Sequence, residues 1–200
     1  QALAQPAQAS KLKLLSSYLH AAHPRRRWPI TYDEGHRAGI LHRLDAPSSG
    51  LILAAKRYEA FYDLELQLNA GRVSREYAVL CCGWISPSLQ DINARIYWKN
   101  GSTAPSEIRS MGKPSASHIK TVAHLICNSR SFSFLAVQIA TGRRHQIRVH
   151  TAHMGHPVAC DGKYAAHQTL AFDRGRFRRN FLHRCRLVFR DRSGALRQAT

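Results

Sequence analysis

The chain has 200 residues and 44% of them are apolar, which suits one globular domain and excludes an intrinsically disordered protein. Thirty Lys and Arg residues against twelve Asp and Glu residues give a net charge of +18, which favours a polyanionic partner, nucleic acid before an anionic membrane surface. No apolar stretch approaches the roughly 18 residues that a membrane-spanning helix needs, so we expect no membrane insertion.

Five cysteines, two of them adjacent, form no CxxC motif. Their odd count does not suit a disulfide framework, so we expect a reducing, intracellular compartment, without a choice among cytoplasm, nucleus and organelle. The chain begins with Gln rather than Met, which is typical of a fragment or a processed form.

Residues 1–27 are interpreted as an N-terminal extension and residues 28–200 as the main domain. Residues 1–10 are rich in Ala and Gln and are expected to be poorly ordered. Ser10 is expected to cap a short amphipathic helix, and three consecutive arginines follow that helix as a basic linker. The apolar residues of this helix recur at near-helical spacing: Leu12, Leu15, Leu19 and Ala22.

The next segment predicts two strands, a helix and a third strand. Residues 38–44 are typical of a strand that runs into a Pro/Ser/Gly turn, and the apolar run 51–55 is typical of a buried strand. Residues 59–69 have apolar side chains at helical spacing, and Gly71 follows as a stop signal. Residues 75–83 predict another strand.

The C-terminal half predicts a hairpin, a helix and a final strand. Residues 118–127 and 131–140 flank a turn and alternate polar with apolar side chains, as the two strands of a hairpin do. Residues 144–154 predict a helix, and residues 186–189 predict a strand. Interleaved helices and strands that include a hairpin indicate a mixed α/β (α+β-like) domain rather than a doubly wound parallel sheet.

Asp45 is the first candidate for chemistry, because it lies where a predicted strand ends in a loop. Acidic residues are scarce in this basic chain, so we expect an ionised carboxylate that can act as a nucleophile or a base. The alternative is an Asp that only caps a turn, which is the commoner use of such a residue.

A second candidate is the segment 141–150, TGRRHQIRVH. Its glycine turn opens a predicted helix whose first turn carries Arg143, Arg144 and His145, and these cations together with the helix N-terminus would attract phosphate. Arg148 shares a helical face with Arg144 and could pair with a carboxylate or a phosphate. The alternative is a solvated arginine face.

Other signals are weaker. Tyr77, near the start of a predicted strand, could stack on a base, although a core tyrosine is the commoner outcome. His150, His153 and His156 have spacing that raises metal binding, but no HExxH motif, nearby Cys or carboxylate pair completes a zinc ligand set. No GxxxxGK[ST] or GxGxxG motif is present, so a nucleotide cofactor is not indicated.

Several segments, in the family's order, resemble the RluA-type pseudouridine synthases. Residues 39–56, GILHRLDAPSSGLILAAK, are similar to the signature around the family's HRLD motif. Residues 75–77, REY, and residues 141–150 are similar to the second and third motifs, and later matches lie at residues 154–158 and 182–183. The resemblance implies a pseudouridine synthase fold with a bent, largely antiparallel central sheet flanked by helices.

The resemblance also implies that the chain isomerises specific uridines to pseudouridine in a structured RNA, ribosomal or transfer, as a monomer and without a metal or an organic cofactor. Asp45 would be the catalytic residue and Arg148 its ion-pair partner. Tyr77 would stack on the target base, and Arg43 would fill the space that the flipped uridine leaves. A catalytically inactive RNA-binding module with the same fold is the alternative. Further RNA contacts are expected from Arg143, Arg144 and His145.

The chain departs from the family pattern in three respects. Ser48 stands where the family usually has Thr, which preserves the hydroxyl group. Cys160 and Ala165 replace frequent glycines, so an altered loop is expected there. The family's usual opening strand is not visible in residues 1–37, and without it one sheet edge would be incomplete.

Overall fold

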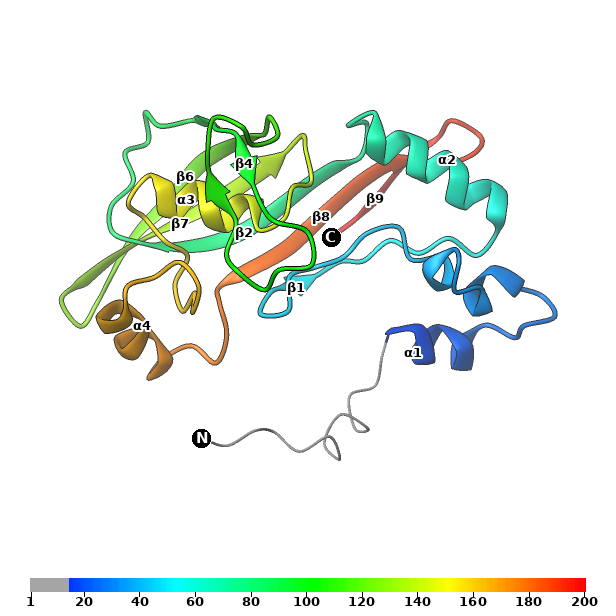
Figure 1. Ribbon diagram of the computed structural model, residues 1–200, viewed down its shortest axis with the longest axis horizontal. Coiled ribbons are helices and arrows are strands. Elements are labelled where there is room, and N and C mark those ends of the chain that lie inside the picture. The colour runs from blue at the N-terminus through cyan, green and yellow to red at the C-terminus, as the bar shows by residue number, and fades with distance from the viewer. Residues whose placement is uncertain (1–14) are drawn as a thin grey trace. The chain divides into compact units, whose positions relative to one another are not determined.

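The computed structural model describes residues 15–200, and its first element is helix α1 (Leu15–Ala22) (Figure 1). The short helix predicted here is confirmed over that range, whereas its predicted cap and the Ala/Gln-rich start of the chain lie outside the described residues. The Trp28 backbone N–H donates to the Pro24 carbonyl (3.0 Å) and closes a turn after the helix.

The described chain divides into two compact units. The first contains the residues up to Arg43 together with Ile52–Gln67. The second contains Leu44–Leu51 and Leu68–Thr200, so it includes Asp45 and most of the strands. The boundary expected between an extension and a main domain at residues 27 and 28 stays a prediction.

The first unit is mainly helical. Phe61 and Leu64 are buried on one side of its longest helix, and this helix confirms the prediction for residues 59–69. Within the described part of the chain, no helix is long and apolar enough to cross a membrane. The helices of this unit are α1, the 3-10 helices η2 (Pro29–Tyr32) and η3 (Arg37–Gly39), and nearly all of α2 (Tyr58–Asn69).

The strands predicted at residues 38–44 and 51–55 are wrong. Residues 37–39 have positive φ angles of 54°, 54° and 78°, which interrupt the extended backbone that a strand needs. The two segments still meet, because the Leu41 N–H donates to the Leu53 carbonyl (3.0 Å), but only an isolated bridge forms there. The apolar residues of the second segment are mostly half-buried rather than buried.

The second unit is built on a seven-stranded sheet of order β1-β8-β2-β7-β6-β3, with β9 paired to β8 (Figure 1). β1 runs parallel to β8 and the other pairs are antiparallel, which confirms the mixed, largely antiparallel fold. β1 and β9 both lie along the edge of β8 that faces away from β2. The strands of this sheet are β1 (Ser49–Gly50), β2 (Ser74–Cys82), β3 (Asp91–Asn93), β6 (Ala116–Cys127), β7 (Arg130–Ile139), β8 (Leu182–Arg190) and β9 (Leu196–Ala199). A separate small sheet pairs β4 (Ile96–Tyr97) with β5 (Glu107–Ile108).

Successive residues of the sheet feed two separate cores, because side chains of a strand alternate between its faces. Val79 packs in the larger core together with Ile147 of α3. Its neighbour Leu80 packs on the other face, where Phe172 of α4 lies against the smaller core. The sheet therefore carries one helix on each face. These helices are α3 (Gln146–His153) and α4 (His167–Arg174).

The predicted hairpin is confirmed as β6 and β7. Asn128 and Ser129 at its turn have φ angles of 47° and 61°, the left-handed pair that matches the twist of hairpin strands. The alternation of polar and apolar residues fails at Ser133, which is fully buried. Its hydroxyl donates to the Gly83 carbonyl (2.9 Å), so the buried polar group is paired.

Ser129→Gly should raise the free energy of unfolding by roughly 0.5–1 kcal/mol, because glycine relieves the strain of a left-handed residue. Urea unfolding of the purified chain measures the change. Ser131→Gly, on the extended backbone of β7, is the matched control and should lower stability instead. Equal changes in the free energy of unfolding at both positions would contradict the inference that Ser129 is strained.

Candidate active site

Asp45 lies on a turn that backbone hydrogen bonds fasten to β8. The Ser48 N–H donates to the Asp45 carbonyl (2.8 Å), and the Leu51 N–H donates to the Arg184 carbonyl (3.0 Å). Gly50, at φ 123°, lies so close to the Arg184 backbone that a side chain there would collide with it. The position of Asp45 therefore depends on pairing with β8, although the long strands predicted on either side are absent.

Helix α3 begins at Gln146, two residues later than predicted. His145 has a left-handed backbone (φ 56°), so Arg143, Arg144 and His145 precede the helix instead of forming its first turn. The Gln146 Oε1 atom accepts hydrogen bonds from the Thr141 hydroxyl (2.8 Å) and the Arg143 N–H (3.0 Å). These bonds hold the preceding loop closed and fix the start of the helix.

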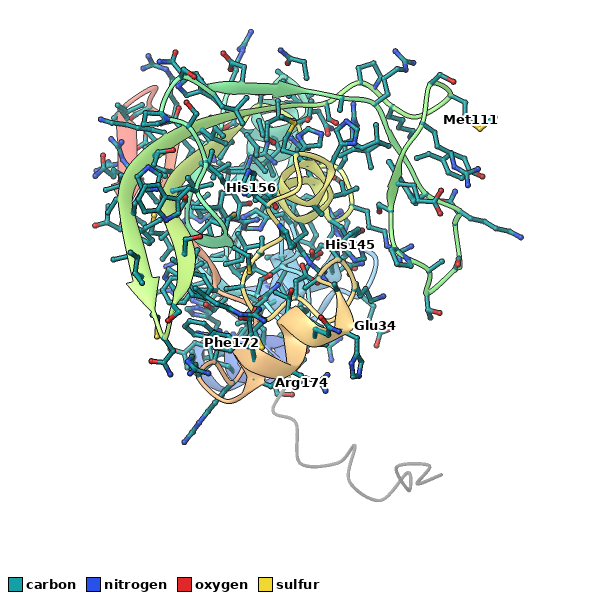
Figure 2. The ribbon with its side chains drawn as sticks, turned by 90° about the vertical axis from the view of Figure 1, so that its left-hand side faces the viewer. Glu34, Met111, His145, His156, Phe172 and Arg174 are labelled. Carbon is teal, nitrogen blue, oxygen red and sulfur yellow. The ribbon has the colours of Figure 1, made fainter. Side chains whose placement is uncertain are left out.

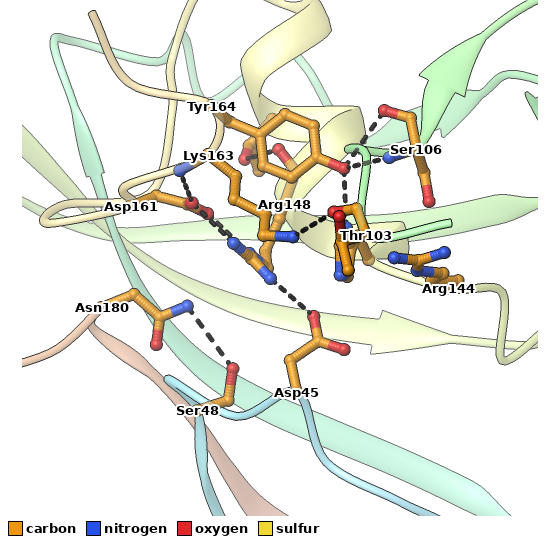
Figure 3. A network of polar contacts seen from close by, with 12 residues as sticks. Asp45, Ser48, Thr103, Ser106, Arg144, Arg148, Asp161, Lys163, Tyr164 and Asn180 are labelled. Carbon is orange, nitrogen blue, oxygen red and sulfur yellow. Dashed lines mark hydrogen bonds and ion pairs between the residues drawn. The ribbon is translucent and has the colours of Figure 1, made fainter. Parts of the chain in front are cut away.

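Arg148 of α3 links two carboxylates (Figure 3). Its Nε and Nη2 atoms donate to the two oxygens of Asp161 (2.6 and 2.7 Å), and its Nη1 donates to Oδ2 of Asp45 (3.1 Å). The side chains of Arg148 and Asp161 are 2% and 0% exposed, whereas that of Asp45 is 18% exposed. Burial lowers the pKa of Arg148, but hydrogen bonds and charge from Asp161 and then Asp45 outweigh it and raise the pKa above its ordinary value. The ion pair implied by the resemblance is thus present.

Asp161 is a site residue that the predictions missed. Its Oδ1 also accepts a hydrogen bond from the Lys163 N–H (3.0 Å), so the carboxylate is fully engaged. A signal was available, because Asp161 is the only acidic residue between Glu107 and Asp173. In so basic a chain, an acid that follows an arginine-bearing helix is a candidate partner for an arginine of that helix.

Two departures from the family pattern lie beside this site. Cys160 adopts a left-handed backbone (φ 62°), the conformation that glycine takes most easily. Its N–H donates to Oδ2 of the buried Asp173 on α4 (2.7 Å), which ties the loop to that helix. Ser48 keeps the hydroxyl expected of the family, and Oγ accepts a hydrogen bond from Asn180 Nδ2 (3.5 Å) (Figure 3).

Tyr164 packs against the guanidinium group of Arg148. The Arg148 Cζ atom lies 5.2 Å from the centroid of the Tyr164 ring. The Tyr164 hydroxyl accepts from the Ser106 N–H (2.7 Å) and bonds with Nδ1 of His145 (2.9 Å). Burial raises the pKa of Tyr164 to about 12 and lowers the pKa of His145 to about 4, so both groups are neutral near pH 7.

The loop between β4 and β5 is bonded to the same site. Lys163 Nζ donates to the Thr103 carbonyl (2.7 Å) (Figure 3). Arg144 Nη2 donates to the Ala104 carbonyl (3.2 Å). Lys163 and Arg144 are thereby fixed to this loop. The loop of the small sheet is therefore joined by hydrogen bonds to residues that precede and follow Arg148 in the sequence.

Tyr77 lies in the larger core and is only 6% exposed. Its hydroxyl accepts hydrogen bonds from Nε and Nη2 of Arg184 (2.9 and 2.7 Å), and the Arg184 Cζ atom lies 5.1 Å from the ring centroid. Arg184 is thus a second residue that the predictions missed. The stacking of Tyr77 on a base stays a prediction.

The other predicted contact residues differ in their settings. Arg43 is exposed and belongs to the first unit. Arg143 is half-buried and its Nε donates to the Pro114 carbonyl (3.2 Å). His145 is buried, and its Nδ1 atom bonds with the Tyr164 hydroxyl. Their contacts with RNA stay predictions.

The histidines considered for zinc make other bonds. His150 is fully buried, and its ring nitrogens bond with the hydroxyls of Ser117 (3.0 Å) and Ser115 (3.1 Å). His156 donates from Nδ1 to the Cys82 carbonyl (3.0 Å). Among residues 15–200, no group of three or more His, Cys, Asp or Glu side chains could hold a metal ion.

The family model described as RNA pseudouridylate synthase matches residues 15–153. That range is more than half of the chain. The chain therefore belongs to the RNA pseudouridylate synthase family.

Individual relatives agree with this assignment. The chain is 35% identical over 130 residues to ribosomal large subunit pseudouridine synthase D of Pasteurella multocida, a match that covers 64% of this chain and 38% of the relative. It is 36% identical over 155 residues to the protein of that name in Pseudomonas aeruginosa, with 74% of this chain and 47% of the relative covered. The chain thus spans less than half the length of these relatives. The solved structure of human RNA pseudouridylate synthase domain containing 1 is 25% identical and superposes with a TM-score of 0.71, covering 87% of this chain and 75% of that one.

Asp161→Asn should lower the free energy of unfolding by about 3–5 kcal/mol, because it leaves most of the buried Arg148 charge uncompensated. Chemical denaturation measures the change. Glu107→Gln, which removes the exposed partner of Arg109 (2.6 Å), is the matched control and should cost less than about 1 kcal/mol. A similarly small cost for both variants would show that the buried pair does not stabilise the fold.

His145→Gln should flatten the dependence of stability on pH. The folded-state pKa of His145 is about 4, below its ordinary value of 6.5, so the unfolded chain binds a proton first as the pH falls. His145 therefore contributes stability above pH 6.5 that is lost progressively as the pH falls toward 4. Unfolding free energies measured across this window should have a smaller slope in the variant. His167→Gln, at an exposed position, is the control, and an identical slope in wild type and His145→Gln would refute the assignment.

Proposed function

We propose that this chain converts uridine to pseudouridine in RNA and that Asp45 is its catalytic residue. The observation that supports this most directly is the asymmetry of the charge cluster. Arg148 and Asp161 are buried, and their bidentate pair fixes the guanidinium group. Asp45 accepts one hydrogen bond from the Arg148 guanidinium group, and its carboxylate stays partly exposed, so that a substrate can reach it. Buried groups that orient one accessible group are the usual plan of a catalytic site.

The proposed reaction is an isomerisation in which the bond from ribose C1′ to uracil N1 breaks and a bond from C1′ to C5 forms. The C5 hydrogen leaves as a proton, and the freed N1 takes up a proton, so that no atoms are gained or lost overall. The Asp45 carboxylate starts the reaction by attacking C1′ or by removing the C2′ proton. Arg148 keeps the carboxylate oriented. The scheme requires neither a metal nor an organic cofactor.

The proposed substrate is ribosomal RNA, with transfer RNA as the second choice, and the chain is proposed to act on it as a monomer. The names of the bacterial relatives favour the large ribosomal subunit. The net charge of +18 suits a polyanion. A run of exposed arginines begins on α4, where Figure 2 labels Phe172 and Arg174, and this helix is tied to the Cys160 loop beside Asp161. These arginines are Arg174, Arg176, Arg178 and Arg179.

Other residues are proposed to hold the uridine in place. Tyr77 would contact the base with its ring, which Arg184 holds by the hydroxyl. Arg43 would fill the gap that the extruded nucleotide leaves, since this chemistry requires the base to leave its stack. Additional contacts with the RNA are assigned to Arg143, Arg144 and His145.

Asp45→Asn should reduce tritium release from RNA labelled with [5-³H]uridine by about 100-fold or more, because the variant lacks the carboxylate that begins the reaction. Purified wild type and variant are compared on large-subunit ribosomal RNA and on transfer RNA. Asp91→Asn, which removes an exposed carboxylate, is the matched control and should release tritium like the wild type. Equal release by wild type and Asp45→Asn on every RNA would refute the proposed role of Asp45.

A further inference from the structure

The first unit carries a cluster of five exposed cations from two segments that are far apart in the sequence. One segment is the turn that follows α1, and the other immediately precedes α2. Both belong to the same unit, so their arrangement does not depend on the second unit. The cations of this Trp28 cluster are Arg25, Arg26, Arg27, Lys56 and Arg57.

Three of these cations converge on the half-buried ring of Trp28. Measured to the centroid of that ring, Lys56 Nζ lies at 4.9 Å, Arg27 Cζ at 5.2 Å and Arg57 Cζ at 5.7 Å. An indole ring attracts each cation, but three like charges around one ring repel one another. Within the described residues, no ion pair joins any member of the Trp28 cluster to a carboxylate, including the neighbouring Glu59.

The backbone beneath the cluster is fixed by buried contacts. The Trp28 carbonyl accepts a hydrogen bond from the Thr31 hydroxyl (2.8 Å), and Thr31 is 1% exposed. Ile30, between them, is fully buried. The Arg57 carbonyl accepts from the Phe61 N–H in the first turn of α2 (3.0 Å). The cations are therefore held together by the fold of the unit and not by their own interactions.

Neighbouring features extend the positive surface. Arg25 Cζ lies 5.8 Å from the centroid of the Tyr32 ring, which in turn stacks on His20 at 4.3 Å. The N-terminus of α2 follows directly after Arg57 and adds the partial positive charge of a helix end. Cations, aromatic rings and a helix N-terminus are the groups that proteins present to a nucleic acid backbone.

We propose that the Trp28 cluster binds phosphates of the RNA, at a contact distinct from the residues around Asp45. The identity of the polyanion as RNA rests on the proposed function. Phosphate oxygens would relieve the repulsion among the three cations, and arginine forks bind them in bidentate fashion. Binding would release counterions from the RNA, so this contact must weaken as salt increases.

The test is the triple variant Arg27→Gln/Lys56→Gln/Arg57→Gln, with RNA affinity measured as a function of salt concentration. The affinity of wild type for the labelled ribosomal RNA should exceed that of the variant by about tenfold or more at low salt. The slope of log affinity against log salt should fall by about 2–3 in the variant, since each phosphate contact contributes about one. In the double variant Lys56→Gln/Arg57→Gln, which keeps the turn after α1 intact, the same slope should fall by about 2.

The matched control is Arg72→Gln/Lys99→Gln/Arg192→Gln, which removes three exposed positive charges from the second unit. It should change the slope much less, because those cations do not converge. Unchanged thermal midpoints would show that the variants are folded. An equal loss of RNA affinity in the control and test variants would overturn the proposal, since net charge alone would then account for the loss. The proposal would also be overturned if the triple variant kept the RNA affinity of the wild type but lost binding to phosphatidylserine vesicles. That result would favour a membrane contact.

The two proposals fail separately. Asp45→Asn should bind RNA with the affinity and salt slope of the wild type, even though its tritium release is reduced by about 100-fold or more. The triple variant should keep the wild-type rate at saturating RNA while its KM rises. Wild type that binds RNA without isomerising it would refute the proposed function alone, whereas a triple variant with unchanged slope would refute the Trp28 cluster alone.

Discussion

A buried guanidinium group shared by two carboxylates is the constraint on which the second unit depends. Removing an arginine from water is costly, and only well-placed opposite charges and hydrogen bonds recover that cost. Arg148 obtains them from Asp161 in a loop after its own helix and from Asp45, more than a hundred residues earlier in the sequence. The charge of Arg148 is therefore fully compensated only when the helix, the loop and the Asp45 turn are in place together.

The surrounding structure meets this requirement by fixing the backbone near each charge. Gly50 lets the Asp45 turn lie against β8, and Gln146 closes the loop that starts α3. Cys160 accepts a left-handed conformation, and Asp173 of α4 compensates by binding its N–H. The result is one partly exposed carboxylate in a rigid, positively charged setting, which is the property that the proposed isomerisation needs.

Patterns with a short range in the sequence predicted the fold well. The helix at residues 59–69 and the hairpin of β6 and β7 follow from periodicity and turn residues, because those signals act between near neighbours. The prediction of strands at residues 38–44 and 51–55 was wrong because it also rested only on signals between near neighbours. An apolar run is compatible with several backbones, and the left-handed residues 37–39 together with the pairing of β1 with β8 exclude a regular strand there.

The motifs were sufficient to identify the family, and the resemblance to that family singled out Asp45 and Arg148, which the structure brings together as an ion pair. Charge composition was likewise enough to indicate a polyanionic partner. The clamp that Asp161 places on Arg148, and the meeting of Lys56 and Arg57 with Trp28, required the folded chain. Such contacts join segments whose separation in the sequence has no characteristic pattern. Only the packing of the intervening strands and helices brings these segments into contact.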